Sequence, residues 1–271
     1  MHKSTLLFSS LWFLTATALA ASTQDADALA RAHRMQLEFR QGNSAVSKPL
    51  VSHLEAAVAR SPDNAQLWEA LGHAYMSLQG SMYAGPPDIP TLIATGEHAR
   101  DAYARSLALK QPNPLVRAGH GMSTMVVSQL KGDGPGVMAG IEEMNAAVRE
   151  APKSKAVRLT RGFTIIHLPP DMRDNKAVTE DLRFILDTAP GGRPEDVLHV
   201  LLGDVLAETG QLPAARAEYA QVTGASAFAA EQVKLRLADL AKGPVRPENV
   251  TAVRMGTGTQ CAMCHAPGTD N

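Results

Sequence analysis

The chain has 271 residues, of which 26 are basic and 27 acidic, so its formal net charge is −1 at pH 7. This balance argues against a nucleic-acid-binding protein, because such proteins carry an excess or a stripe of basic side chains. Aromatic residues make up only 4% of the chain, while alanine and leucine are abundant, which is typical of packed helices rather than a β-sandwich.

Residues 1–20 have the pattern of a secretory signal peptide. A short basic start is followed by an apolar run that ends at Leu14, and Ala-Leu-Ala at positions 18 to 20 offers a cleavage site. The run is too short to span a bilayer, and no later segment is long and apolar enough to do so. We therefore expect an exported, soluble protein, such as a periplasmic one, that begins near Ala21 and has no membrane span.

The next recognisable element is a helix with a repeat-like order of residues. Trp68, Leu71, Gly72 and Tyr75 follow the order W-x-x-L-G-x-x-Y. The segment before it has the spacing of a second helix that closes an earlier unit, with Leu50, Leu54, Ala57 and Pro62. Both segments fit a repeat with a period near 34 residues.

The clearest complete unit comes later, in HVLLGDVLAETGQLPAARAEYAQV. Gly203 lies on its first helix, Gly210 at its turn, and Ala215 and Tyr219 on its second helix. Two weaker units lie between, over about 114–152, with Gly140, Met144 and Ala147 on the second helix, and about 154–190, with Gly162, Leu182 and Ile185. Residues 226–241 are expected to form a final capping helix.

These units resemble tetratricopeptide repeats, and the resemblance covers about residues 31–241. It implies an all-α fold, a right-handed α-solenoid of about five helix pairs over residues 21–242 that binds protein partners on its concave face. Amphipathic helices rich in alanine and leucine can also produce such patterns by chance. Two segments rich in glycine and proline, 80–96 and 131–136, depart from the family and are expected to be loops.

The tail, residues 243–271, carries the motif with the most specific chemistry. Cys261, Cys264 and His265 form Cys-x-x-Cys-His, the spacing of c-type haem attachment. The two thiols add to the two vinyl groups of the porphyrin, and the adjacent imidazole becomes the proximal iron ligand. The segment CAMCHAPG also resembles the start of small class I cytochromes c, but the chain ends six residues after His265. We expect one covalent haem c without a cytochrome domain around it.

The sixth iron ligand is left open by the sequence. Register within the repeats places His73 and His167 on first helices, which line the groove in this family, so both are candidate distal ligands. His120 and Met255 are weaker candidates, and an open or water-filled position is equally compatible with the sequence.

Other interpretations of the two cysteines remain. They can form a redox disulfide, or they can bind a soft metal such as copper together with the histidine. No phosphate-binding loop, zinc-protease signature or nucleophile elbow occurs. We therefore expect no enzyme, although a haem with an open position can support weak peroxidase-like activity.

Two functional hypotheses follow. The first is a periplasmic protein whose helical array docks a redox protein or an envelope complex, while its haem transfers electrons or serves in assembling a redox complex. The second is a scaffold of an envelope complex without haem, whose motif forms a disulfide or binds copper.

Overall fold

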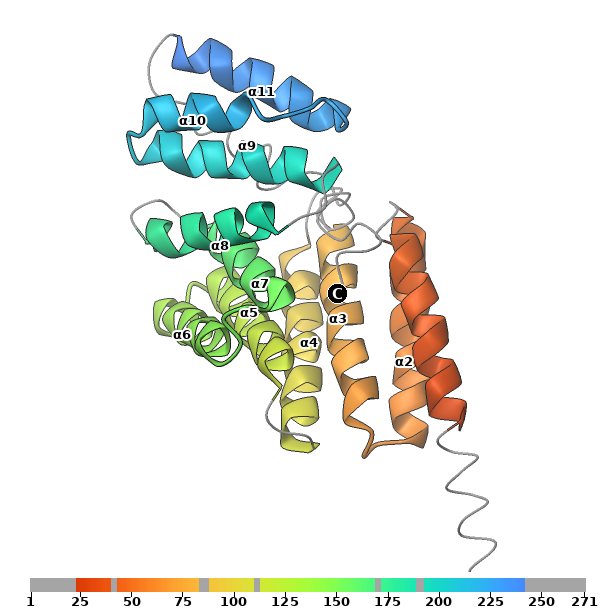
Figure 1. Ribbon diagram of the computed structural model, residues 1–271. Coiled ribbons are helices and arrows are strands. Elements are labelled where there is room, and N and C mark those ends of the chain that lie inside the picture. The colour runs from red at the N-terminus through yellow and green to blue at the C-terminus, as the bar shows by residue number, and fades with distance from the viewer. Residues whose placement is uncertain are drawn as a thin grey trace, which may run out of the picture.

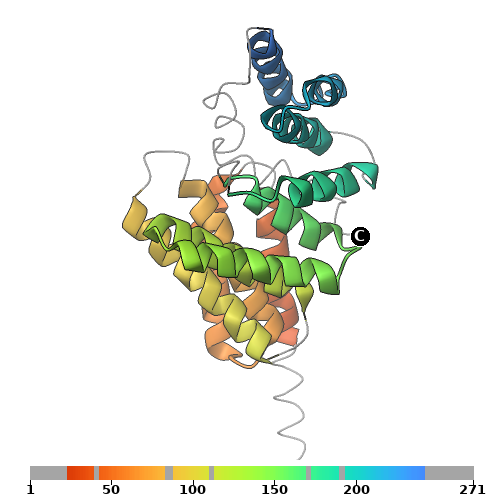
Figure 2. The ribbon, with the colours of Figure 1, turned by 90° about the vertical axis from the view of Figure 1, so that its left-hand side faces the viewer.

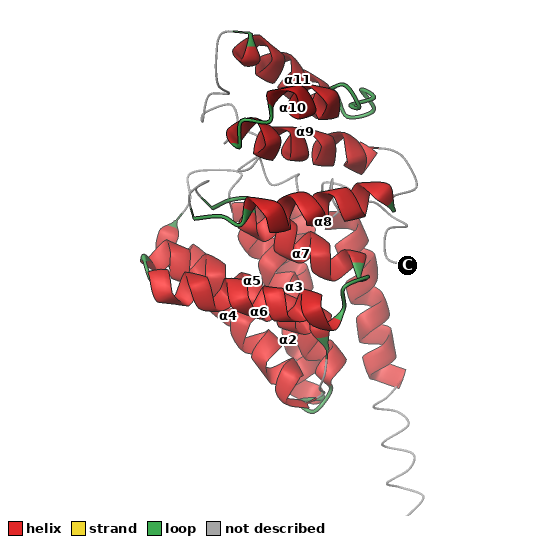
Figure 3. Ribbon diagram, turned by 60° about the vertical axis from the view of Figure 1, so that its left-hand side comes forward, coloured by secondary structure: helices red, strands yellow, loops and turns green. Residues whose placement is uncertain are grey.

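The computed structural model describes residues 23–39, 43–82, 88–109, 113–168, 172–188 and 193–241. The expected signal peptide, residues 1–20, and the haem-attachment tail, residues 243–271, lie outside these ranges. Within the described residues the chain forms helices and turns without a strand, which confirms the all-α prediction (Figure 3). Among the helices described, none combines the length and the hydrophobicity needed to cross a bilayer.

The helices follow one another in space in the order of the sequence (Figure 1). After a helix over residues 23–39 and a short 3-10 turn η1 (Ser44–Val46) come α2 (Ser47–Arg60), α3 (Ala65–Ser81), α4 (Ile89–Leu109), α5 (Pro114–Lys131), α6 (Gly134–Glu150), α7 (Lys155–Ile165), α8 (Asn175–Asp187), α9 (Arg193–Glu208), α10 (Leu212–Tyr219) and α11 (Ala227–Leu240). Consecutive helices pack against each other along most of this order, and α5 also contacts both α3 and α7.

Side-chain caps explain where many of these helices begin. Asn64 accepts hydrogen bonds from the backbone of Gln66 and Leu67 before α3, and Asn113 does the same before α5. Such caps satisfy N–H groups that have no partner inside the helix, and each contributes about 1 kcal/mol. Glycines end two helices, because Gly132 after α5 and Gly210 after α9 adopt positive φ values of 71° and 78°.

Both predicted loops are wrong for most of their length. In the segment 80–96, α3 continues to Ser81 and α4 already begins at Ile89. Gly96 lies inside α4, where a Cβ atom would come within 2.6 Å of Gln79 Nε2 and 2.7 Å of Val127 Cγ2. This glycine therefore permits close packing of helices. In the segment 131–136, only residues 132 and 133 separate α5 from α6.

The last described helix is attached through a fully buried ion pair. The Arg236 guanidinium of α11 donates to both carboxylate oxygens of Asp204 in α9, at 2.6 and 2.9 Å, and neither side chain is exposed. Tyr219 of α10 donates a further hydrogen bond to Asp204 at 2.8 Å. Helices α9, α10 and α11 are thus joined around one carboxylate, and they form one end of the molecule in Figure 2.

The predicted capping helix over residues 226–241 agrees with the structure. Helix α11 spans Ala227–Leu240, Ser226 caps its N-terminus by accepting from the backbone N–H of Ala229, and Ala241 follows its last residue. Its buried face includes Ala229, Arg236 and Leu240, whereas Leu235 and Leu237 are exposed. The described chain therefore ends on a helix that packs on one side only.

Candidate functional site

A cavity of about 560 Å³ opens along one face of the molecule, and its lining comes from five helices. We call it the central groove and define it by the residues that line it: Leu29, Ala32, His33, Gln36 and Phe39 from the helix over 23–39; Leu50 and Leu54 from α2; Gln66, Glu69, Ala70, His73, Met76 and Ser77 from α3; Leu115, Gly119 and Met122 from α5; Ala156, Leu159, Thr160, Phe163 and Thr164 from α7. Within each helix these positions recur at intervals of three or four, which places them on one face.

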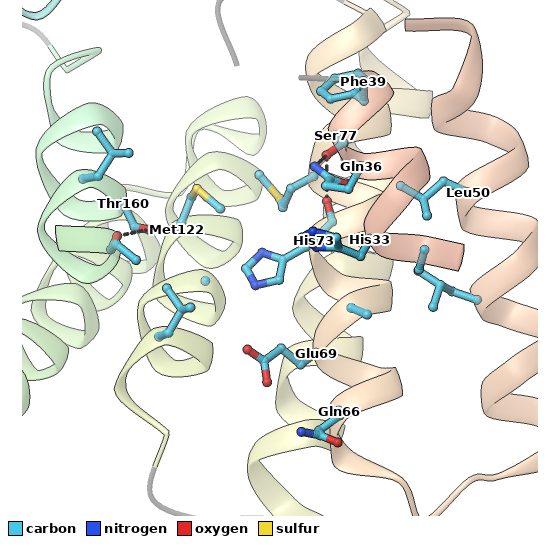
Figure 4. Close-up of a pocket in the computed structure, with 18 of the residues that line it drawn as sticks. His33, Gln36, Phe39, Leu50, Gln66, Glu69, His73, Ser77, Met122 and Thr160 are labelled. Carbon is cyan, nitrogen blue, oxygen red and sulfur yellow. Dashed lines mark hydrogen bonds between the residues drawn. The ribbon is translucent and has the colours of Figure 1, made fainter. Parts of the chain in front are cut away.

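The groove is mostly apolar with a few polar groups, the usual character of a ligand or cofactor site. Figure 4 places Glu69 and His73 on one wall, with Met122 and Thr160 across from them. Its volume lies within the range of about 300–1,000 Å³ that small-molecule and cofactor pockets occupy. In the part of the chain that the structure describes, no group of three or more His, Cys, Asp or Glu side chains is arranged to hold a metal ion.

His73 is the histidine that the structure fixes most firmly on the groove wall. Its Nδ1 lies 2.8 Å from the hydroxyl of Tyr103, and the two rings meet edge to face with centroids 5.3 Å apart. Tyr103 comes from α4, behind the groove, and is fully buried. Burial, together with the negative charge of Glu69, raises the pKa of Tyr103, so its phenol remains neutral and can exchange only a hydrogen bond with His73.

A second set of hydrogen bonds involves the backbone of His73. Gln36 donates to the hydroxyl of Ser77 at 2.9 Å, and that hydroxyl donates to the carbonyl oxygen of His73 at 3.0 Å. These bonds tie the helix over 23–39 to α3 about one turn from His73, where Figure 4 shows Gln36 and Ser77 next to each other. The side chain and the backbone of His73 therefore both have fixed partners.

His167 does not occupy the position that the repeat register predicted. Helix α7 ends at Ile165, and His167 follows in a turn, where it does not line the groove. Its half-buried ring packs edge to face against Phe163, with centroids 5.4 Å apart. Two prolines at positions 169 and 170 explain the early end, because residues before proline avoid helical backbone angles.

The weaker candidates are also accounted for where the structure describes them. His120 of α5 lies 2.7 Å from Glu143 of α6 through its Nδ1 and does not line the groove. Met255, Cys261, Cys264 and His265 all lie outside the described residues. Of the candidate iron ligands, His73, His120 and His167 are the ones that lie within the described residues.

Sequence reasoning missed one groove histidine, His33. It lies on the helix over 23–39, is exposed, and lines the groove with Leu29, Ala32 and Gln36. The intervals among these four residues, i, i+3, i+4 and i+7, are those of one helical face and would have indicated it. The side chain that holds His73, Tyr103, has no comparable signal, because it lies thirty residues further along the chain and its role depends on packing.

Comparisons with known proteins add no relative: no family model, no curated protein and no solved structure matches this chain.

Proposed function

We propose that this chain is an exported tetratricopeptide-type protein that carries one covalent haem c on its tail and acts in electron transfer or in assembling a redox complex. Cys261 and Cys264 form the two thioether bonds, and His265 is the proximal iron ligand. The observation that carries the proposal is the Cys-x-x-Cys-His motif, which contains the only two cysteines of the chain. When bound, the haem supplies one-electron redox chemistry.

The arrangement of the helices supports the repeat part of this proposal. A right-handed solenoid of helix pairs places the first helix of each pair on a common concave face. The central groove is lined mainly by the helix over 23–39 and by α3, α5 and α7, which are alternate helices of the chain, and α2 adds Leu50 and Leu54. Gly72 of α3 and Gly203 of α9 each face a tyrosine ring from the next helix at a distance that only a glycine permits.

The groove also suits a protein that docks a partner and holds it near a haem. Its surface is apolar with polar groups of both kinds, among them Gln66, Glu69 and Thr160, which can pair with backbone groups of a bound protein. A haem joined by a short tether to the same molecule has a high effective concentration at such a partner. Electron transfer within the docked complex is therefore favoured over free diffusion.

The test is expression of the full chain together with a periplasmic haem-attachment system. The proposal predicts a Soret band that survives denaturation, because thioether bonds hold the haem. Replacing both cysteines, Cys261→Ser with Cys264→Ser, removes this band and leaves the helical circular dichroism unchanged. If the matured protein is colourless, the redox role is wrong and a docking scaffold, with a disulfide or copper at the motif, remains.

A further inference from the structure

Among the described residues that line the central groove, one side chain has a fixed charge, and that charge is negative. The lining contains Glu69 of α3 but no lysine or arginine, although the whole chain has 26 basic and 27 acidic residues. The composition of the chain therefore does not explain this bias. The carboxylate is half-buried, and Figure 4 shows it pointing from α3 toward the space between the groove walls.

The hydroxyl groups of the lining add acceptors rather than donors. Ser77, Thr160 and Thr164 each donate their hydroxyl hydrogen to a carbonyl oxygen four residues earlier in the same helix, at 3.0, 2.9 and 2.5 Å. A hydroxyl group has one hydrogen to donate and two lone pairs that accept. Because the hydrogen is used within the helix, any further hydrogen bond of these side chains is one that they accept. A ligand of this groove is therefore favoured if it donates.

Glu69 can accept from a ligand while it keeps its contacts within the protein. Asn113 Nδ2 donates to Glu69 Oε2 at 3.3 Å. An ionised carboxylate has about four lone-pair positions on its two oxygens, so a bound cation adds to the contacts already made. A hydrogen bond between an ionised donor and a carboxylate is also about twice as strong as one between neutral groups.

The apolar lining suits the aliphatic part of a basic side chain. Leu50 and Leu54 are almost fully buried, and α5 and α7 supply Leu115, Met122 and Phe163. Lysine and arginine pack their methylene groups on apolar surface while the charged end meets a polar partner. Both parts of such a side chain thus find a matching surface in the groove.

The groove is also long enough for a short peptide. Its lining on α3 runs from Gln66 to Ser77, which is about 16 Å of helix. An extended chain rises about 3.3 Å per residue, so about five residues have the same length.

We propose that the protein partner docked in the central groove presents a lysine or arginine side chain flanked by aliphatic residues, and that Glu69 pairs with its cation. This inference rests on the docking role proposed above and names the chemistry of the partner. It excludes an acidic segment, because a second carboxylate beside Glu69 would be repelled and would lose hydration.

The test uses the full, matured chain with isotope-labelled methionine methyl groups, observed by nuclear magnetic resonance. The probes are synthetic peptides Gly-Leu-X-Leu-Gly with blocked ends, in which X is lysine, methionine or glutamate. Met76 and Met122 line the groove, whereas Met138 of α6 is 57% exposed and lies outside it. We expect the lysine peptide to shift the signals of Met76 and Met122 but not that of Met138. It should bind about fivefold more tightly than the methionine peptide, and the glutamate peptide should bind most weakly.

Two variants separate pairing at Glu69 from a general effect of charge. Glu69→Gln keeps the shape of the side chain, and it should reduce the affinity for the lysine peptide to that for the methionine peptide. Glu97→Gln in α4 removes the same charge outside the groove lining and should leave all three affinities unchanged. If Glu69→Gln fails to fold, Gln66→Lys tests the same point. Gln66 is exposed one turn before Glu69, so a lysine there competes for the carboxylate and should weaken binding of the lysine peptide.

The inference is overturned if the lysine and methionine peptides bind equally, if the glutamate peptide binds best, or if no peptide shifts Met76 and Met122. A preference for lysine that persists in Glu69→Gln, or in Gln66→Lys where that variant replaces it, also overturns it. These outcomes do not depend on the haem. They are therefore distinct from a colourless matured protein, which overturns the proposed redox function instead.

Discussion

In two regions of the molecule a glycine packs against a tyrosine ring of the next helix, but the surroundings of the two pairs differ. In α3 and α4, Gly72 faces Tyr103, whose hydroxyl meets His73; in α9 and α10, Gly203 faces Tyr219, whose hydroxyl meets Asp204. Each polar residue directly follows its glycine. Asp204 is fully buried and paired with Arg236, whereas His73 is half-buried and lines the central groove. The comparison shows that the same packing of a glycine against a tyrosine lies in a buried core in one place and behind a groove wall in another.

The largest loss of stability is expected from breaking the buried ion pair between Arg236 and Asp204. Arg236→Met removes the guanidinium that pairs with the fully buried Asp204 carboxylate, and losing one partner of a buried ion pair costs about 3–5 kcal/mol. Urea denaturation followed by circular dichroism measures this loss. The double variant Asp204→Leu with Arg236→Met should recover most of it, because no charge then remains buried. A single variant that loses less than about 1 kcal/mol would contradict a structural role for the pair.

The two tyrosines should differ when their hydroxyls are removed. Tyr219→Phe takes a hydrogen bond from a fully buried carboxylate, and bonds to charged groups contribute about 1.5–3 kcal/mol. Tyr103→Phe takes one from a half-buried imidazole, and we expect a loss of about 0.5–1.5 kcal/mol. The same urea titration on both variants compares the two losses of stability. An equal loss would show that the buried Tyr219–Asp204 bond contributes no more than the Tyr103–His73 bond at the groove wall.

Replacing the glycine that faces each tyrosine tests the same comparison by steric overlap. Gly203→Ala places a Cβ atom 2.3 Å from Tyr219 Cε1, and Gly72→Ala places one 2.7 Å from Tyr103. Overpacking costs about 1–3 kcal/mol, of which the better helix propensity of alanine offsets up to about 1 kcal/mol. We expect both variants to melt at lower temperature, Gly203→Ala more so. Gly134→Ala in α6 is the control, since a Cβ there meets no atom within 4 Å, and it should not be destabilised.

Lowering the pH should destabilise the end of the molecule formed by α9, α10 and α11 first, with a smaller effect than the substitutions above. Burial raises the pKa of Asp196 in α9, but hydrogen bonds from the backbone of Ser226 and from Thr223 outweigh it and hold this pKa below its usual value. A lowered pKa in the folded state means that stability is present above the unfolded value of about 3.9 and is lost as pH falls through the folded value.

Asp196 connects α9 to the turn before α11, so hydrogen exchange in α11 should increase below about pH 4 before exchange in α3 does. Asp196→Asn serves as the matched variant, and it should remove this extra sensitivity of α11 to acid. Simultaneous opening of both regions would show that Asp196 does not set the order.

Much of the helical pattern could be predicted because it depends on local signals. Gly210 at a turn and the final helix over residues 226–241 are read directly from the residues, and the structure agrees. Gly96 misled the prediction because a glycine that ends a helix and one that admits a neighbouring side chain look the same in sequence. Only the position of Gln79 and Val127 around it decides between the two.

The candidate site was less accessible from the sequence for the same reason. His73 was identified from its register on a first helix, and it does line the groove. Its restraint by Tyr103 depends on two glycines and three helices meeting, which no local pattern encodes. His167 lies beyond the end of α7, because the register was extended into a segment that prolines 169 and 170 close.

The most direct test of the central claim is the mass of the tail in the mature protein. Arg254 is the last lysine or arginine of the chain, so trypsin releases residues 255–271 with both cysteines and His265. The account predicts that this peptide carries the added mass of one haem after full denaturation. A peptide with only the mass of its amino acids, from protein matured beside a working haem-attachment system, would contradict it.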